Sequence, residues 1–341
     1  MSDIAARAGT TIGVVSVALN GGKSKTLRVS AETRLRIQTL ADELGYRRDP
    51  RASALATGKN HVIGLMLPHA HSFAVPDPFY SLVSSGVAAA ASQLGYNLML
   101  YTAVAEEESD RATKMIDRRV DGLILVLPPE GTPIVEECHR RGIRAISIIQ
   151  RPEQSPLSVN SCDYEGGRLA TEHLLDLGHR RIAHLHGNRV IHTSQARYQA
   201  YVDALANAGI EADPNLTRDG KFDRGIAKAA TQELLKLPSK RRPTAIFAAN
   251  DLSAHGAIDA IYEAGLRVPE DISVVGYDDT WYALVTSPPL TSVNMAVDLI
   301  GRRAAEMLIA SIDGRPDEHH AVLPVSLTVR RSSGPPPPEP R

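Results

Sequence analysis

At 341 residues, 43% of them apolar and 23% charged, the chain has the composition of an ordinary globular protein with room for two or three domains. Its net charge of −1 hides an asymmetry, because residues 1–60 carry ten Lys and Arg against five Asp and Glu, which leaves 28 against 34 for the remainder. Two distant cysteines, no apolar run near the ~20 residues that span a bilayer and no signal-peptide pattern argue against a disulfide framework and against a membrane partner, so we expect a cytoplasmic protein.

Residues 1–46 carry the pattern of three short helices. The expected helices are "SDIAARA" (2–8), "TIGVVSVALN" (11–20) and "AETRLRIQTLADEL" (31–44). Ser2 and Ser30 are the candidate N-caps, and Gly9 and Gly45 are the residues that end the first and third helices. Helix, glycine turn and helix in a segment of net positive charge are typical of a helix-turn-helix DNA-binding domain. A helical protein–protein module with a solvated basic loop is the alternative.

The second of these helices has no charged side chain. Its expected outward positions are Ile12, Gly13, Ser16, Val17 and Asn20. Apolar side chains in a major groove can contact thymine methyl groups while phosphate contacts supply affinity. We therefore predict that Ile12 and Val17 contact methyl groups or sugars and that Gly13 permits close approach. Ser16 and Asn20 are expected to make polar contacts. The basic side chains of the following loop, which would hold phosphates, are Lys23, Lys25 and Arg28.

Residues 47–60 are typical of a linker. Pro50 and Gly58 bracket "RASALAT", which is only about two turns long, and isolated helices below ~12 residues are marginal in water. We expect this segment to become ordered only on a partner, and a flexible tether is the alternative.

From residue 61 the pattern alternates between strands and helices. Apolar runs such as "VIGLMLP", "GLILVLP" and "AISII" come first, and after a break near "RPEQSPLSV" the alternation restarts with "RIAHLHG", "TAIFAAN" and "ISVVGYD". Apolar strands separated by helices indicate parallel sheets buried on both faces, so we expect residues 61–331 to form two α/β subdomains with a cleft between them. The expected boundaries are about 61–156 plus 289–317 for the first subdomain, about 157–288 plus 318–331 for the second, and 332–341 for a disordered proline-rich tail.

Polar side chains follow the strands of the second half. Asn250 and Asp251 come after "TAIFAA", and Asp278 comes after "ISVVGY". Ligands of α/β sheets bind outside the carboxyl ends of the strands, where amide and carboxylate groups can hold ligand hydroxyls. Asp251 has a second interpretation that we favour, as the cap of the next helix. Trp281, the single tryptophan, is a candidate for stacking on a sugar face, and packing in its own loop is the alternative.

The basic segment resembles the N-terminal domain of the LacI/GalR family of bacterial transcription regulators. The resemblance rests on "DIAARAGTTIGVVSVALNG" and "RVSAETRLRIQTLADELGYR", and it places Thr11 at the start of the DNA-reading helix. Val17 stands where the family often has an arginine. "ASALATGKN" resembles the family hinge, in which Ala52 and Leu55 match. The family's paired hinge helices insert a leucine into the minor groove, so the resemblance implies Leu55 as the wedge.

The rest of the chain resembles the sensor of the same family and, through it, the periplasmic sugar-binding proteins. The matching stretches include "GGRLATEHLLDLGHRRIAHLHG" and "AIFAANDLSAHGAIDAIYEAGLRVPEDISVVGYDDTWYALVTSPPLTSV". The implied fold is an N-terminal all-α helix-turn-helix domain followed by a periplasmic-binding-protein-like α/β body of two doubly wound parallel-sheet subdomains. The resemblance implies effector contacts in the cleft from Phe79, Gln150, Arg197, Asn250 and Asp278. Gln150 replaces a frequent aspartate, and so does Cys162.

No residue pattern indicates a metal, a cofactor or an enzyme. His179, His184 and His186 match no standard zinc spacing and are expected in the core or between the subdomains. No G-x-S-x-G, Walker or G-x-G-x-x-G motif is present. An α/β enzyme is therefore the weaker hypothesis, and it leaves the basic segment unexplained.

The sequence thus predicts a ligand-responsive, sequence-specific DNA-binding regulator, most simply a repressor. Two helix-turn-helix domains would bind a near-palindromic double-stranded operator, so we expect a homodimer. The tail "GPPPPEPR" cannot form the leucine-heptad segment of the family's tetramers. A sugar or related polyol in the cleft is expected to change the affinity for DNA by rotating the subdomains, and a purine, an amino acid or a phosphorylated compound is the alternative effector. A sugar-binding protein or sensor without direct DNA regulation is the rival interpretation.

Overall fold

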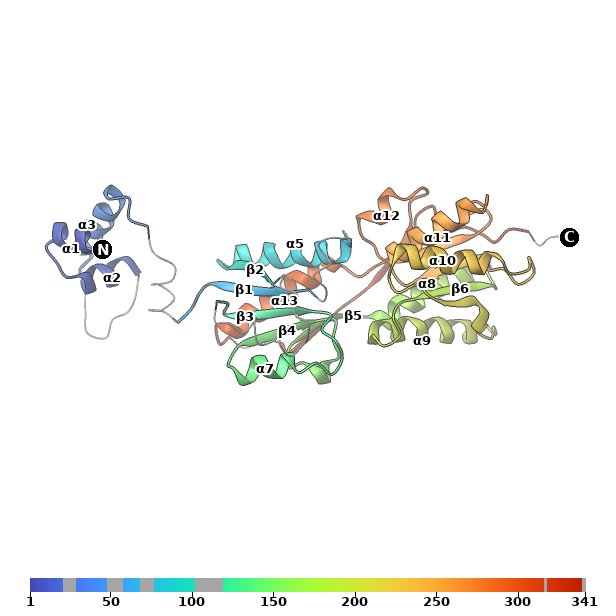
Figure 1. Ribbon diagram of the computed structural model, residues 1–341, viewed down its shortest axis with the longest axis horizontal. Helices are drawn as coiled ribbons and strands as arrows, with labels where there is room; N and C mark the ends of the chain where they lie inside the picture. Colours follow the sequence, from blue (N-terminus) through green and yellow to red (C-terminus); the bar gives the residue numbers. More distant parts are fainter. Residues whose placement is uncertain (21–28, 48–57, 68–76, 102–118, 316–317, 339–341) are drawn as a thin grey trace. The chain divides into compact units, whose positions relative to one another are not determined.

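The computed structural model describes residues 1–20, 29–47, 58–67, 77–101, 119–315 and 318–338, which fall into two compact units, 1–61 and 62–341 (Figure 1). The expected phosphate contacts Lys23, Lys25 and Arg28 and the hinge residues Ala52 and Leu55 lie outside the described residues. None of the helices within the described ranges is long and apolar enough to cross a membrane.

The first unit is a bundle of three helices around a small apolar core. The helices are α1 (Ser2–Ala8), α2 (Ile12–Asn20) and α3 (Ala31–Glu43). Val15 and Ala18 of α2 pack with Ile37 of α3 in the core. Gly9 takes φ = 62°, a left-handed conformation that glycine adopts without steric cost, and it turns the chain between α1 and α2. These helices confirm the helix-turn-helix pattern.

The two expected serine caps have different outcomes. The Ser30 hydroxyl accepts a hydrogen bond from the Thr33 amide at 3.1 Å and caps α3, as the sequence predicts. The prediction for Ser2 is wrong, because α1 already begins at Ser2 and Met1 holds the cap position. The Ser2 hydroxyl instead donates to the Asp3 carboxylate at 3.3 Å.

The first sheet of the second unit is parallel throughout. Its strands, in spatial order, are β11 (His320–Leu323), β5 (Ser158–Ser161), β4 (Arg144–Ile148), β3 (Gly122–Val126), β1 (Val62–Met66) and β2 (Asn97–Tyr101). Helices α5 (Pro78–Gln93) and α13 (Val297–Ile312) cover one face, and α7 (Ile134–Arg140) covers the other. Side chains alternate accordingly, with Ile124 towards α5 and α13 and Leu123 towards α7. Both faces are therefore buried.

Two glycines let α5 and α13 touch. A Cβ atom on Gly86 would lie 1.9 Å from the carbonyl oxygen of Asp298, and one on Gly301 would lie 2.3 Å from that of Val83. No larger residue fits at this crossing, so the two glycines allow α13 to pack beside α5 on the first sheet. In the chain, α13 follows a strand of the second sheet, so the chain has crossed between the sheets before this helix.

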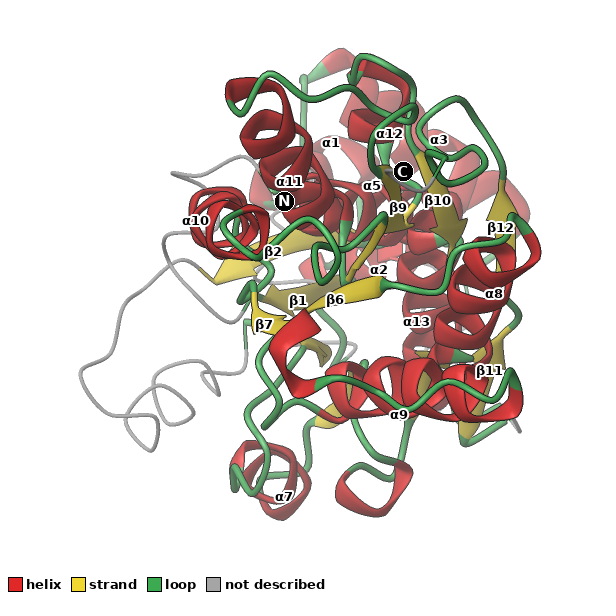
Figure 2. Ribbon diagram, turned by 90° about the vertical axis from the view of Figure 1, so that its right-hand side faces the viewer, coloured by secondary structure: helices red, strands yellow, loops and turns green. Residues whose placement is uncertain are grey.

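The second sheet repeats the same plan. Its strands, in spatial order, are β12 (Ser326–Thr328), β10 (Thr291–Asn294), β9 (Ser273–Asp278), β8 (Ala245–Ala248), β6 (Ile182–His186) and β7 (Thr217–Asp219). All neighbours are parallel except β12, which runs antiparallel to β10. Its helices are α8 (Asp163–Asp176) and α9 (His192–Asn207) on one face, α10 (Arg224–Leu235) and α11 (Asp251–Glu263) on the other, and the short α12 (Trp281–Val285). Figure 2 shows the strands between these two helix pairs.

Strand pairing moves the subdomain boundaries, expected at about 157, 289 and 318, to slightly later positions in the chain. Strands β5 and β11 pair with each other in the first sheet, and β10 pairs with β9 in the second. The chain therefore crosses between sheets after β5, between β10 and α13, and between β11 and β12. The physical reason is that a strand completes its ladder before the chain leaves the sheet, whereas the proline-rich break in the sequence only marks a loop before β5.

The tail expected to be disordered from Ser332 is held against the second sheet. The buried Ser332 hydroxyl donates to the Val274 carbonyl at 2.6 Å and accepts from the Thr291 amide at 2.8 Å. The carbonyl of Gly334 accepts from the His179 ring at 2.9 Å. These contacts satisfy polar groups at the amino end of β9, so proline content alone was a poor guide to this segment.

Candidate functional site

A cavity of about 530 Å³ lies between the two sheets of the second unit, at the carboxyl ends of their strands. Leu127 follows β3, Ile149 follows β4, and Asn250 follows β8. The lining residues are Asp77, Phe79, Tyr80, Leu127 and Ile149 from the first subdomain, and Asn188, Ile191, Thr193, Arg197, Lys221, Phe222, Asp223, Asn250, Leu252 and Asp278 from the second. This is where α/β folds bind small ligands.

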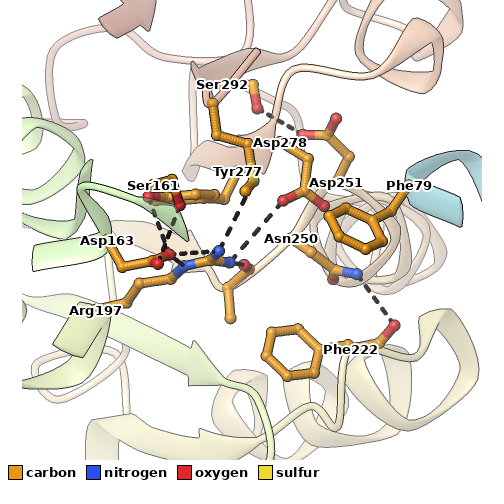
Figure 3. A network of polar contacts seen from close by, with 12 residues as sticks. Phe79, Ser161, Asp163, Arg197, Phe222, Asn250, Asp251, Tyr277, Asp278 and Ser292 are labelled. Atoms are coloured by element: carbon orange, nitrogen blue, oxygen red, sulfur yellow. Dashed lines mark hydrogen bonds and ion pairs between the residues drawn. The ribbon is translucent and has the colours of Figure 1, made fainter. Parts of the chain in front are cut away.

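Arg197 of α9 is the buried positive charge of this cavity (Figure 3). Its Nε donates to Asp163 Oδ1 at 2.8 Å, its Nη2 lies 2.7 Å from the same oxygen, and its Nη1 donates to the Ala249 carbonyl at 2.5 Å. The guanidinium carbon lies 3.5 Å from the centre of the Tyr277 ring, a cation–π contact. Although burial opposes the charge, Asp163 and the groups around it hold the pKa of Arg197 above its ordinary value. Arg197 therefore provides a fixed positive charge at the cavity wall.

Asp278 brings a carboxyl group to the same wall under unusual conditions. Its backbone has φ = 99° at the last residue of β9, a conformation that non-glycine residues adopt at a cost of order 1–3 kcal/mol. Burial raises its pKa well above the usual range, while Arg197, whose Nη1 lies 4.0 Å away, opposes that shift. The carboxyl group lies at the cavity, where it can donate or accept a hydrogen bond.

Asn250, which lines the cavity, also caps the helix that follows β8, a role that the sequence suggested for Asp251. The amide oxygen of Asn250 accepts from the Ser253 amide at 2.9 Å and caps α11, and its nitrogen donates to the Phe222 carbonyl at 3.2 Å. The favoured interpretation of Asp251 as the cap is wrong, because Asp251 is already inside the helix.

Asp251 instead ties α11 to β9 and β10. Its carboxylate accepts from the Thr280 amide at 2.7 Å and from the Ser292 hydroxyl at 2.6 Å. Burial is the main cause that raises the pKa of Asp251 to about 7. The carboxyl group therefore lies behind the cavity wall and supports the turn that carries Asp278.

Two phenylalanines supply ring faces from opposite subdomains. Phe79 lies in the first turn of α5, and Phe222 lies in the loop between β7 and α10. A Cβ atom on Gly187 would lie 2.0 Å from the Phe222 ring, so glycine is needed there to seat that ring. Both rings border the cavity (Figure 3).

The first unit presents the uncharged helix that the sequence predicts. Val15, Ala18 and Leu19 are buried, and Ile12 is 54% exposed. The Thr11 hydroxyl accepts from the Val14 amide at 3.4 Å, and the Arg34 guanidinium donates to the Ala18 carbonyl at 3.0 Å. This second contact anchors α3 to the last turn of α2, so the helix is held firmly with Ile12 outward.

The similarity of this chain to known proteins extends over both units. The chain is 34% identical over 339 residues to the HTH-type transcriptional regulator CelR of Thermobifida fusca, covering 96% of each protein. It belongs to the LacI family of transcriptional regulators. Residues 171–333 match the periplasmic binding protein-like domain family. Among solved structures, a CelR–cellobiose complex matches with a TM-score of 0.73, 32% identity and coverage of 96% of this chain and 98% of that chain. A Lac repressor dimer bound to operator and the anti-inducer ONPF matches with a TM-score of 0.82, 29% identity and coverage of 97% and 98%.

This LacI-family regulator is thus a DNA-binding protein with a helix-turn-helix unit and a periplasmic-binding-protein-like body. The expected fold class is confirmed. Of the expected effector residues, the structure brings Phe79, Arg197, Asn250 and Asp278 to one cavity.

The structure does not place the other two expected effector residues of this LacI-family chain at the cavity. Gln150 is buried, and its side chain donates to Gln154 at 3.3 Å. Trp281 is 49% exposed at the start of α12, where it packs on Tyr282 with ring centres 4.2 Å apart. Each of the two side chains instead contacts a residue close to it in the sequence.

Sequence reasoning missed several residues that this LacI-family site uses. Asp163 and Tyr277 hold Arg197, and Asp77 and Phe222 line the cavity. Asp77 had a signal, because it precedes Pro78 at a helix start, where aspartate is a common cap. The pairing of Asp163 with Arg197 had none, because it depends on how α8 and α9 pack.

The three histidines weighed as zinc ligands, His179, His184 and His186, make structural contacts. His179 bonds to Thr244 at 2.9 Å, and His184 stacks on Phe247 with ring centres 4.6 Å apart. Burial lowers the pKa of His184 to about 3, so it is neutral at physiological pH. Within the part of the chain that the structure describes, no three His, Cys, Asp or Glu residues gather as a metal site would require.

Proposed function

We propose that this LacI-family chain is a homodimeric repressor that binds a pseudo-palindromic operator and changes its DNA affinity when a sugar occupies the cavity. The observation that carries the proposal is the cavity, because its lining comes from two subdomains of a chain that also bears a helix-turn-helix unit. A ligand that contacts both Phe79 and Arg197 favours one relative orientation of the subdomains, which is the requirement for an allosteric switch.

The sugar and operator assignments gain support from relatives. The CelR structure contains cellobiose, and the Lac repressor structure is a dimer on its operator. Phe79 and Phe222 offer the ring faces, and Asn250 and Asp278 the polar groups, that a polyhydroxylated ring needs. We place the protein in the cytoplasm with its DNA, and we propose that the bound sugar is released unchanged.

We propose that α2 reads the operator through Ile12, Gly13 and Val17. Thr11, Ser16 and Asn20 would add polar contacts, Lys23, Lys25 and Arg28 would contact phosphates, and the hinge residues Ala52 and Leu55 would lie in the minor groove. Val17→Ala should then relax selectivity at a thymine-containing position of each half-site. An unchanged base preference would contradict the proposed role of Val17.

The function is tested by selecting bound duplexes from random DNA with the full chain at fixed salt, with and without a panel of sugars. We expect a palindrome with a flexible pyrimidine–purine step at its centre, whose recovery one sugar abolishes or enhances. Salt-sensitive binding without any motif would contradict the proposal and favour a sensor without direct DNA regulation.

A further inference from the structure

Helix α9 begins at the cavity with its first backbone amides unpaired. Ile191, which lines the cavity, holds the cap position, and no side chain accepts a hydrogen bond from the helix there. The first amide to find an acceptor is that of Gln195, which donates to the Ile191 carbonyl at 3.1 Å. Within the described residues, the amides of residues 192–194 therefore have no acceptor. Unpaired amides at the positive end of a helix attract a negatively charged group.

The Thr193 hydroxyl is an independent indication of a ligand at the start of α9. Thr193 is only 3% exposed, and it lines the cavity. Among the described residues its hydroxyl has no hydrogen-bond partner, although a buried polar group without a partner is costly. Side chains of a helix tilt towards its N-terminus, so this hydroxyl lies on the side of the unpaired amides. One ligand group that accepts hydrogen bonds would satisfy the hydroxyl and the amides together.

Lys221 supplies a positive charge to the same subdomain wall. It lines the cavity from the loop between β7 and α10, and its ammonium group has no carboxylate partner among the described residues. This loop is held in place, because the Phe222 carbonyl accepts from the Asn250 side chain at 3.2 Å. Arg197, in contrast, is already paired with Asp163. Lys221 is therefore the cation of the described lining that is available to a ligand.

The carboxyl groups of the lining do not take the place of such a ligand. Asp77 accepts from the Phe79 amide at 2.9 Å at the start of α5, and Asp223 accepts from the Ile226 amide at 2.8 Å at the start of α10. Each of these two charges is thus balanced in part by its own helix. Burial raises the pKa of Asp278 well above its usual range, which favours the neutral form. Within the described residues, no carboxylate caps α9 in the same way.

We infer that the effector is a sugar that carries an anionic group, a carboxylate or a phosphate, and that the first turn of α9 binds this group together with Thr193 and Lys221. The inference rests on the proposed sugar response and narrows its ligand class. Oxygens of a carboxylate or a phosphate accept the hydrogen bonds that amides, a hydroxyl and an ammonium group donate. The sugar ring itself would lie between Phe79 and Phe222.

The test is calorimetric titration of the full chain with glucose, galactose, mannose and cellobiose, each together with its uronate and its 6-phosphate. For at least one sugar we expect the uronate or the phosphate to bind about tenfold more tightly than the neutral form, with a smaller ratio at high salt. The acidic form that binds more tightly identifies the source of the anionic group. If every sugar that binds does so at least as tightly in its neutral form, the inference is wrong.

Variants locate the anionic group. Lys221→Gln removes the charge and should lower the ratio of affinities for acidic and neutral sugar about threefold, because an exposed charge contributes modestly. Thr193→Val removes the hydroxyl at nearly constant shape and should lower the ratio about fivefold, whereas Thr193→Ser should retain it. Lys240→Gln is the matched control, because Lys240 is exposed and does not line the cavity. A ratio that neither Lys221→Gln nor Thr193→Val changes would contradict the inference.

Failure of the proposed function looks different. If no sugar, neutral or acidic, binds while the DNA selection still yields a palindrome, the sugar response is wrong and the inference falls with it. If only neutral sugars bind and one of them alters DNA binding, the proposed function stands and the inference alone fails.

Discussion

A buried arginine is stable only while its partners stay in place, and Arg197 depends on Asp163 in this way. Taking a guanidinium and a carboxylate out of water is costly. The cost is offset here because each of the three guanidinium nitrogens has an oxygen partner, Asp163 for Nε and Nη2 and the Ala249 carbonyl for Nη1. The resemblance to a known family located Arg197 in the sequence. It could not locate Asp163, because the pairing becomes visible only when α8 and α9 are packed together.

Removal of Arg197 should therefore destabilise the body strongly. Arg197→Met leaves Asp163 and Asp278 buried without their cation, and we expect a loss of about 3–5 kcal/mol together with loss of sugar binding. Arg168→Met is the control, because the pairs of Arg168 with Glu165 and Glu172 lie at the surface, where ion pairs contribute little to stability. Urea unfolding followed by Trp281 fluorescence measures both. Equal losses of unfolding free energy in the two variants would show that the buried pair of Arg197 with Asp163 is not essential for stability.

Asp251 makes a pH-dependent contribution to stability. Because its pKa is raised from 3.8 to about 7 in the folded protein, its contribution is fully present at low pH and is lost as the pH rises through about 7. The neutral Asp251→Asn variant keeps an acceptor for Thr280 and lets the Ser292 hydroxyl accept instead of donate.

The free energy of unfolding of Asp251→Asn, relative to that of the unaltered chain, should thus rise between pH 5 and pH 8. Taking this difference removes the opposite trend from buried histidines such as His184 and His179, whose pKa values are lowered. A difference that stays constant with pH would mean that Asp251 is ionised throughout.

At the scale of elements, sequence patterns within one helix or strand predicted the structure more dependably than they predicted contacts between distant segments. The apolar runs predicted both sheets, and Ser30 predicted the start of α3. The crossings between sheets were misplaced because strand pairing, as of β5 with β11, joins residues more than 150 positions apart. The ordered start of the tail was missed for the same reason, since Ser332 bonds to β9.

Loss of the Ser30 cap should loosen α3 in the full chain. Ser30→Ala removes the acceptor for the Thr33 amide, and such substitutions cost about 1 kcal/mol. We expect the amides in the first turn of α3 to exchange with solvent about fivefold faster in hydrogen-exchange measurements. Ser2→Ala is the control and should change exchange in α1 little, because Ser2 caps no helix.

The start of the tail should contribute to the stability of the second subdomain. A chain that ends at Arg331 loses the Ser332 contacts with Val274 and Thr291 and leaves His179 without the Gly334 carbonyl. Buried polar groups left without partners cost about 1–3 kcal/mol each, so the midpoint of thermal unfolding should fall. A chain that ends at Pro338 retains these contacts and should have the same midpoint of thermal unfolding as the full chain. Identical melting of both truncations would refute the contribution of the tail.

At the scale of the whole molecule, one chain joins a DNA-binding unit to a cavity that spans two subdomains. The family resemblance foretold this combination. The charge of the cavity could not be foretold, because it depends on which carboxylates cap α5 and α10 at its edge. The three crossings between the sheets allow the subdomains to reorient without breaking either sheet, and a ligand that contacts both subdomains would favour one orientation.

The most direct test is a linkage measurement with the selected operator duplex and the sugar that binds. The affinity for operator is measured with and without saturating sugar, and the affinity for sugar with and without saturating operator, all at one salt concentration. The account predicts two equal ratios that differ from unity by about 5-fold or more, because coupling between two sites is reciprocal. Two ratios of unity would contradict it, since the cavity and the DNA-binding unit would then act independently.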